Sequence, residues 1–452
     1  MVSKLSSPEV LHFLIILSIV LIAARLLGEI CRKFKQPAVV GEILAGIIIG
    51  PSLLGTAFPD LFSSIFLEES RAFGAFDGLA NVGVILLMFV AGIEVDLKQI
   101  RQQGKQAASI SFFGLLFPFA IGFFVIWFFH DYVFAVPAND KLIPALFFGT
   151  ALSITALSVI VKVLLDLNII KTRVGSLVLT AAMIDDFLGW ILFSVIIQMM
   201  NAKAGDASMT SILFVFVFVV FMLTIGKWLV DKLLKFSATY LTPPSGIITV
   251  GICLCFLGAV FTEFLGIRGI FGAFLVGVAV GDSKYFTKPA ENILHQFIVN
   301  IIAPLFFASV GLRVNFLEHF DLSVVLIILG IACIAKIIGA GLGSHVSGLN
   351  KNESMAIAFG MNARGSQEIV LGMIALQTGI IDEQIFVALV VMTVVTILMT
   401  GPLMKYYLDK EYSAHPASAL VMDEQTAEPG TIGQNRQPVA HDGLPSPQKV
   451  HT

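Results

Sequence analysis

The chain has 452 residues, of which 57% are hydrophobic and only 13% are charged, and its formal net charge is −3. Apolar runs of 18 or more residues recur almost to the C-terminus, which excludes a soluble globular protein and indicates a polytopic membrane protein. The four cysteines lie in or beside the apolar runs, so we expect neither a disulfide framework nor a metal cluster.

Thirteen apolar segments are predicted to span the membrane as helices. The first segment lacks a basic leader and a small-residue cleavage site, so we expect it to be retained. In chain order, the predicted spans are residues 9–28, 37–54, 78–95, 106–129, 142–165, 173–200, 210–231, 246–265, 267–282, 293–312, 323–345, 353–378 and 384–408.

Basic residues are distributed unequally between alternate connections of these spans. One set of connections carries most of them, including Arg32, Lys98 and Lys232, whereas the opposite set carries about one each, such as Lys4 and Arg71. The positive-inside rule therefore predicts that the N-terminus lies outside and the C-terminus lies in the cytoplasm.

The apolar pattern stops after the last span. We expect residues 1–411 to form the membrane domain and residues 412–452, which are rich in Pro, Gly, Ala, Gln and Ser, to be a disordered cytoplasmic tail. No βαβ pattern or glycine-rich nucleotide fingerprint follows the last span, so we expect no nucleotide-binding domain in this chain.

Two stretches of the chain share a glycine spacing. Residues 41–50 and 272–281 have glycine at the first, sixth and tenth positions, and residues 91–96 (AGIEVD) match residues 310–315 (VGLRVN). Spans 2–6 are therefore predicted to repeat as spans 9–13. Seven helices separate equivalent members, so the two copies enter the membrane from opposite sides, an arrangement typical of secondary transporters.

Both copies contain a candidate broken helix. The fifth span carries Thr150, Ser153, Thr155 and Ser158, and the twelfth carries the polar segment 360–368. Hydroxyl and amide side chains satisfy backbone groups that unwinding frees, and the exposed carbonyls can then coordinate a cation. We predict two broken helices that cross; the alternative is polar packing contacts in continuous helices.

Asp185 and Asp186 are adjacent in the middle of the sixth span. An ionisable side chain at this depth costs at least ~2.5 kcal/mol, so intramembrane carboxylates usually mark an ion or proton path. Two neighbouring carboxylates repel each other, which favours protonation of one of them. Lys336 lies at a similar depth in the eleventh span and requires one of these two aspartates as its partner.

Other charges in the spans are predicted to be structural. Arg364 and Glu368 are four residues apart and can pair along one face of the twelfth span, where they would also offset the partial charges of half-helix ends. Glu42, Glu94 and Glu263 lie near span ends or on glycine-rich helices, and we expect them to be scaffold residues.

With these residues in place, the chain resembles the bacterial sodium/proton and potassium/proton exchangers of the second cation:proton antiporter family. The resemblance runs from about Leu11 to Leu408. It is carried by residues 37–46 (PAVVGEILAG), 184–186 (IDD), 335–339 (AKIIG) and 361–365 (MNARG).

The resemblance implies a role for each central charge. Asp186 would be the main cation ligand and proton carrier, and Asp185 would face Lys336. A hard cation such as Na+ prefers oxygen ligands, which Asp186, Asp185, Thr155 and Ser153 offer. Sodium is therefore expected at the two aspartates, with K+ or Li+ as competing ions, and no cofactor or enzymatic activity is expected.

The resemblance also implies an architecture of about thirteen helices in inverted five-helix repeats. Residues of about 1–104 and 210–322 would form a dimerising scaffold, and residues of about 105–209 and 323–411 would form an ion-translocating core that moves in the bilayer as an elevator. The expected protein is a homodimer in the cytoplasmic membrane, with no nucleic-acid partner.

These features predict an electrogenic Na+/H+ antiporter in which Asp186 and Lys336 each release a proton for one sodium ion. Exchange of K+ remains open, although glutathione-gated potassium exchangers usually have Gln-Asp in place of Asp185-Asp186 and a C-terminal nucleotide-binding domain.

A cation channel would need a filter segment, which the sequence lacks. An intramembrane aspartyl protease would need its aspartates on different helices, and a signalling protein on the same fold also stays open.

Overall fold

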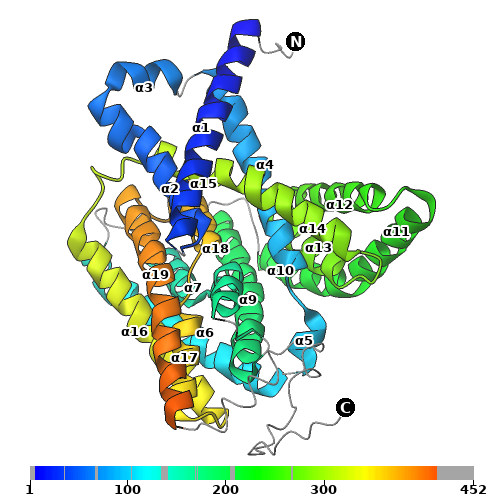
Figure 1. Cartoon of the computed structure of the whole chain (residues 1–452), viewed down its shortest axis with the longest axis vertical. Helices are drawn as coiled ribbons and strands as arrows, with labels where there is room; N and C mark the ends of the chain where they lie inside the picture. The colour runs from blue at the N-terminus through cyan, green and yellow to red at the C-terminus, as the bar shows by residue number, and fades with distance from the viewer. Residues whose placement is uncertain are drawn as a thin grey trace, which may run out of the picture.

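The computed structural model describes residues 6–34, 36–66, 70–102, 104–133, 141–167, 169–170, 172–203, 209–265 and 268–414, and every regular element in these residues is helical (Figure 1). In chain order, the α-helices and the π-helical turns (η) are α1 (Ser7–Lys33), α2 (Ala38–Ile49), η1 (Pro51–Gly55), α3 (Pro59–Ile65), α4 (Arg71–Ile93), α5 (Leu97–Gln102), α6 (Gly104–Val133), α7 (Leu142–Ser153), α8 (Leu157–Asp166), α9 (Arg173–Lys203), α10 (Met209–Phe221), η2 (Met222–Gly226), α11 (Lys227–Tyr240), α12 (Ser245–Phe264), α13 (Gly269–Gly281), α14 (Lys288–Phe297), η3 (Ile298–Ile302), α15 (Ala303–Arg313), α16 (Leu322–Val346), α17 (Lys351–Met361), α18 (Ser366–Gln377) and α19 (Glu383–Ala414).

The predicted all-helical membrane fold is confirmed, and each predicted span falls on one helix or on two consecutive helices. Within the described residues, nine helical segments are long and apolar enough to cross a membrane. The predicted fifth and twelfth spans are missing from these nine because each is broken into two short helices, as expected. The count of thirteen crossings stays a prediction. The disordered tail also stays a prediction, because the tail beyond residue 414 lies outside the described residues.

Close glycine contacts join the two copies of the repeat. Gly46 of α2 lies against the carbonyl oxygen of Ala308 in α15, and Gly277 of α13 lies against that of Phe89 in α4. A β-carbon at either glycine would overlap the facing oxygen, so only glycine permits this approach. The first copy thus supplies α2 and α4, the second supplies α13 and α15, and each tight pair contains one helix from each copy, as a two-fold relation between copies requires.

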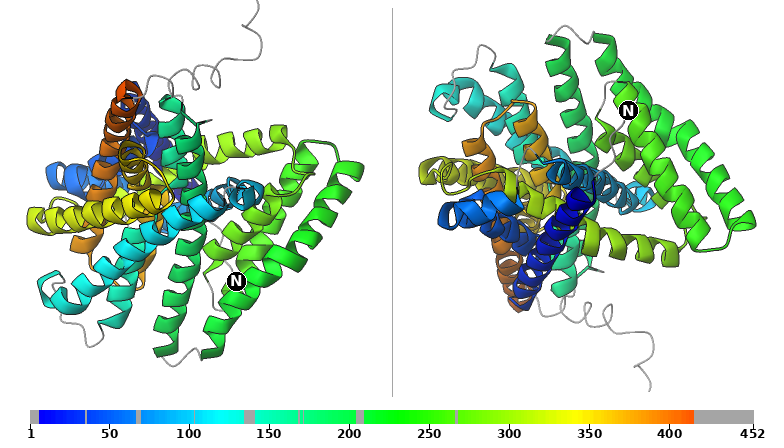
Figure 2. Two further views of the ribbon diagram at one scale, coloured as in Figure 1. Left: turned by 90° about the horizontal axis from the view of Figure 1, so that it is seen from below. Right: turned by 90° about the horizontal axis from the view of Figure 1, so that it is seen from above.

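Helices α10 to α13 form an arm that projects to one side of the molecule, as the views from below and above also show (Figures 1 and 2). Helix α14 runs back from this arm towards α15 at the centre (Figure 1). The start of α1 and the end of α19 lie at opposite ends of the long axis (Figure 1). Which end faces the cytoplasm stays a prediction.

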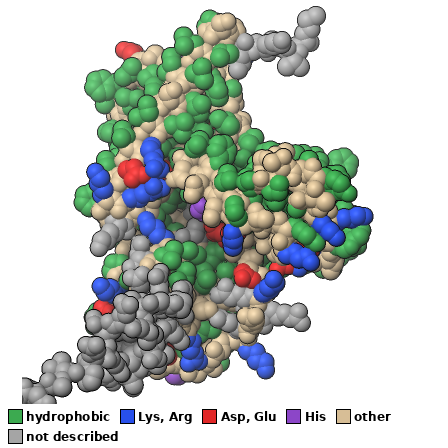
Figure 3. Space-filling view, turned by 45° about the vertical axis from the view of Figure 1, so that its right-hand side comes forward, with side chains coloured by type: hydrophobic (Ala, Val, Ile, Leu, Met, Phe, Trp, Pro, Cys, Tyr) green, Lys and Arg blue, Asp and Glu red, His purple; other side chains and the backbone are tan. Residues whose placement is uncertain are grey.

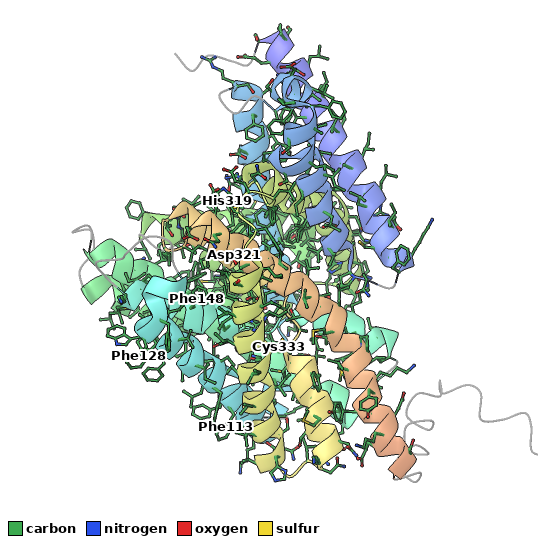
Figure 4. The ribbon with its side chains drawn as sticks, turned by 90° about the vertical axis from the view of Figure 1, so that its left-hand side faces the viewer. Phe113, Phe128, Phe148, His319, Asp321 and Cys333 are labelled. Carbon is green, nitrogen blue, oxygen red and sulfur yellow. The ribbon has the colours of Figure 1, made fainter. Side chains whose placement is uncertain are left out.

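Long helices enclose the two broken ones. Helix α16 packs along α6, because Gly339 and Gly343 admit the backbone around Phe113 and Ser109. Figure 4 shows the two helices side by side, with Phe113 on α6 and Cys333 on α16. This contact brings the middle of α6 and the middle of α16 to the same level beside α9, so that side chains from three helices can meet there.

Candidate cation and proton site

The two broken helices cross and satisfy each other's backbone. Helix α7 ends where Ile154 adopts an extended conformation, and α17 ends at Met361, four residues before Gly365. The free amide of Ala156 donates to the carbonyl oxygen of Ala363 at 2.8 Å. The hydroxyl of Thr155 lies within hydrogen-bond distance of two acceptors, the carbonyl oxygen of Met361 at 2.8 Å and Asp185 Oδ2 at 3.0 Å, which share its one proton. Breaks inside a membrane are stable only when the freed groups find partners in this way.

Arg364, in the second break, hydrogen-bonds to the end of α7. Its guanidinium donates to the carbonyl oxygens of Ala151 at 3.0 Å and Leu152 at 2.8 Å, and it lies 3.3 Å from Glu368. Both charged side chains are buried. A cation at the C-terminal end of a half-helix offsets the negative end of its dipole. The geometry fits the structural role that the sequence suggested for this pair.

Asp185 is completely buried and has three side-chain partners. Ser111 donates a hydrogen bond to Oδ1 at 2.5 Å, while Thr155 at 3.0 Å and Lys336 at 2.7 Å share Oδ2. Both carboxylate oxygens are therefore engaged. The partner that the resemblance implied for Lys336 lies where it was expected, although Thr155 hydrogen-bonds to Asp185 and not to Asp186.

Lys336 has a second partner at the end of α7. Its ammonium donates a short hydrogen bond to the backbone carbonyl oxygen of Ser153. The hydroxyl of Ser153 points elsewhere and donates to the carbonyl oxygens of Gly149 at 2.5 Å and Leu115 at 3.0 Å. The end of a half-helix leaves Ser153 with a free carbonyl oxygen that holds the lysine, and the role of Ser153 as a cation ligand stays a prediction.

Asp186 is buried to the same degree as Asp185 but is only partly satisfied. Gln367 of α18 donates to Oδ2 at 3.2 Å, and the carboxylate also faces the Leu157 backbone amide in the first turn of α8. Its other oxygen, Oδ1, has no hydrogen-bond partner among the described residues. A buried carboxylate with a free oxygen needs a proton, a water molecule or a cation, so Asp186 is the open member of the aspartate pair.

A cavity of about 720 Å³ reaches towards Asp186 from one end of the molecule. Residues of α2, α4, η3 and α15 line one side, and residues of α8 and α18 line the other; its wall includes Gln367, the hydrogen-bond partner of Asp186. Arg32 and Pro37, beside a predicted cytoplasmic connection, line it as well. Figure 3 shows a face hollowed at mid-height with charged side chains around the hollow.

A much smaller cavity, of about 80 Å³, lies towards the other end of α18. Residues of α4, α13, α15 and α18 line it, including Arg268, Arg313 and Gln377. Under the repeat, α8 corresponds to α18, α2 to α13 and α4 to α15, so the two cavities have corresponding walls. Their unequal size means that the conformation is open towards the larger cavity.

Two residues of this site were missed from the sequence. Ser111 lies in an apolar stretch of α6 and carries no local signal; only the packing of α6 against α16 brings it to Asp185. Gln367 lies in the polar segment 360–368 but was passed over for its charged neighbours. A glutamine two residues after a helix break was a usable signal, because its side chain lies in the first turn of the half-helix.

The chain is similar to known transporters over nearly all its length. The family profile "Sodium/hydrogen exchanger, transmembrane" matches residues 16–410. The Na(+)/H(+) antiporter NhaS4 of Synechocystis sp. is 32% identical over 384 residues, which cover 84% of this chain and 93% of that protein. The Na(+)/H(+)-K(+) antiporter GerN of Bacillus cereus is 30% identical over 412 residues, or 90% and 99% of the two chains. The sodium proton antiporter MjNhaP1 of Methanocaldococcus jannaschii has the same fold, with a TM-score of 0.60 and 16% identity over 93% of this chain and all of that one.

Proposed function

The chain belongs to the family of transmembrane sodium/hydrogen exchangers, and on that premise we propose that it exchanges Na+ for protons at Asp186. It is a multi-pass membrane transporter, and cation/proton antiport is its function. The observation that carries the assignment of the site is the contrast between the two aspartates. Asp185 has a partner on each oxygen, whereas Oδ1 of Asp186 has none among the described residues, and Gln367, the hydrogen-bond partner of Asp186, lines the larger cavity.

Competition at one carboxylate produces exchange. A buried Asp186 carrying a bare negative charge is unfavourable, so the charge is neutralised either by a proton or by a cation. Sodium binding therefore displaces the proton, and a proton displaces sodium. The oxygen atoms near this point, from Asp186 and the carbonyl group of Gln367, are of the kind that a hard cation prefers. The site must move between the two sides of the membrane only when a proton or a cation neutralises it. Cation movement is then coupled to proton movement.

Lys336 and Asp185 set the charge of the site. When no cation is bound, the ammonium of Lys336 is held by Asp185 at 2.7 Å and by the carbonyl oxygen of Ser153. A cation drawn to the aspartates competes for the same negative charge and loosens this ion pair. Lys336 then releases its proton, because a buried ammonium without a counter-ion is unfavourable. Two protons leave for one sodium ion, and the exchange is electrogenic.

Alternating exposure follows from the arrangement of helices around the site. The broken helices, α6, α9, α16 and α19 form the moving core, and the remaining helices form a scaffold that dimerises. The larger cavity faces the cytoplasm, as the basic connections predict. Outward exposure requires closure of this cavity and growth of the smaller one, which has corresponding walls.

Proteoliposomes that contain a pH-sensitive dye test this proposal. Sodium added to acid-loaded vesicles should dequench the dye, with Li+ and K+ tested in parallel, because one similar protein is named for K+ as well as Na+. Competition predicts that lowering the pH raises the apparent KM for Na+ while the rate at saturating Na+ is retained. Cation uptake without proton counterflow would contradict antiport, and a response to K+ alone would replace Na+ as the substrate.

A further inference from the structure

Glu42 of α2 is a buried carboxylate in the wall of the larger cavity. Only 6% of the residue is exposed, and it makes no hydrogen bond or ion pair within the described part of the chain. The other two glutamates expected to serve the scaffold differ. Glu263 accepts a hydrogen bond from the Gly269 amide at 2.6 Å, and Glu94 lies 3.4 Å from His295. A purely structural role therefore fits Glu263 but leaves Glu42 unexplained.

The position of Glu42 is rigid. Its neighbour Gly41 lies against the backbone of Leu27 in α1 so closely that no β-carbon fits, and Gly46, five residues after Gly41, is held against α15 in the same way. Helix α2 cannot turn about its axis without separating these backbones. The backbone of Glu42 is therefore fixed at the cavity wall.

The basic groups around the same cavity already have oxygen partners. Arg32 lies 2.9 Å from Glu29, the ammonium of Lys162 donates to the carbonyl oxygen of Gln36 at 2.9 Å, and His295 is paired with Glu94. None of these side chains is paired with Glu42 among the described residues. Its carboxyl group is thus left in the cavity wall without a hydrogen-bond partner among the described residues, and Arg32 and Arg25 are the cationic groups that act on it.

The second copy of the repeat has no such carboxylate. Ala273 is the residue that corresponds to Glu42 in the matched glycine pattern, and it is fully buried. The described lining of the smaller cavity contains two arginines, Arg268 and Arg313, and no acidic residue. The two access routes therefore differ in charge although their helices correspond.

We propose that Glu42 forms a second, transient binding site for a monovalent cation, which holds the ion in the larger cavity before it reaches Asp186. This inference rests on the proposed antiport at Asp186. A single carboxylate with water as the other ligand binds weakly and releases readily, as an intermediate site must. Because the site exists on one route only, it assists both entry and exit of the cation through the larger cavity.

Vesicles of the two opposite orientations test the proposal with Glu42→Gln. The apparent KM for Na+ at the larger-cavity side should rise about fivefold, the size expected from losing one solvated charge at contact distance. The maximal rate from that side and the KM at the other side should stay unchanged, whereas the maximal rate from the other side should fall by the same factor, because a passive exchanger keeps the ratio of maximal rate to KM equal in the two directions. Glu42→Asp should keep most of the affinity, and Glu318→Gln, an equal charge change at an exposed residue outside the cavity lining, serves as the matched control.

Binding measured without transport separates this site from Asp186. In Asp186→Asn protein, broadening of the 23Na resonance should persist, and adding Glu42→Gln should remove it. Equal broadening in the single and double variants would overturn the proposal. So would an unchanged KM, an equal rise at both sides, or loss of all exchange in both Glu42 variants. Absence of exchange in the unaltered protein would instead refute the proposed function.

Discussion

The two broken helices occupy corresponding places in the repeat but do different work. The break between α7 and α8 faces the aspartates, with the Thr155 hydroxyl on Asp185 and the Ser153 carbonyl oxygen on Lys336. The break between α17 and α18 faces mainly the first break, and Arg364 holds the carbonyl oxygens at the end of α7. Beyond the break, Gln367 reaches Asp186.

This difference shows how a duplicated element can be divided between chemistry and support. The first break contains no charge, so its hydroxyl and carbonyl oxygens remain available to the ionisable pair on α9 and α16. The second break carries the buried ion pair of Arg364 and Glu368, which stabilises the crossing. Substitutions should therefore separate into those that stop exchange in a stable protein and those that destabilise the protein.

Asp186→Asn should have the largest effect, because an amide can neither release a proton nor bind a cation by charge. We expect exchange to be abolished while the unfolding temperature in detergent stays close to that of the unaltered protein. Dye dequenching in proteoliposomes and thermal unfolding measure the two quantities. Substantial Na+-dependent proton movement by well-folded Asp186→Asn protein would refute the assignment of the site.

Arg364→Met should act on stability. It leaves Glu368 buried without a partner and frees two carbonyl oxygens, and removing one member of a buried ion pair typically costs ~3–5 kcal/mol. The unfolding temperature should fall sharply. The double variant Arg364→Met, Glu368→Met should recover much of the loss, since replacing both members of such a pair is often neutral. If the double variant is no more stable than the single one, the pair is not the main support of the crossing.

Lys336→Gln should leave slower exchange that no longer responds to membrane voltage. The substitution removes the second group that releases a proton but keeps a polar chain of similar reach. Exchange rates measured with and without an imposed potassium-diffusion potential test this, with the unaltered protein as reference. If the unaltered protein is itself insensitive to voltage, Lys336 is only a structural counter-ion and the stoichiometry is wrong.

Gln367→Leu should have the smallest effect. It tests the hydrogen bond by which Gln367 of the second broken helix contacts Asp186. Losing a donor to the carboxylate favours its protonated form, so protons should compete better with Na+. A hydrogen bond of this length is worth ~1 kcal/mol, which predicts an apparent KM for Na+ raised about fivefold, more at low pH than at high pH. Thr155→Val, which removes a partner of Asp185, is the control; equal KM values in Gln367→Leu and the unaltered protein would exclude the role.

Much of this organisation could be predicted from the sequence because membrane burial makes a few residues conspicuous. Apolar length located the helices, and a charge within an apolar run identified Asp185, Asp186 and Lys336. The glycine spacing indicated the repeat, because close helix contacts leave no other choice of residue. Ser111 and the direction of the Ser153 hydroxyl could not be predicted, since both depend on which helices pack together and on where a half-helix ends.

The pairing of helices across the two copies also determines how the protein can be made. Ser52 just after α2 hydrogen-bonds to Val314 just after α15, which lies 262 residues later in the chain. At ~5–20 residues per second, synthesis of that stretch takes roughly 10–50 s. During this interval α2 resides in the bilayer next to α1, which Gly41 fits, but without α15, the neighbour that Gly46 fits. Packing of α2 must therefore await the second copy. Until then, membrane chaperones that shield unpaired helices have to protect α2.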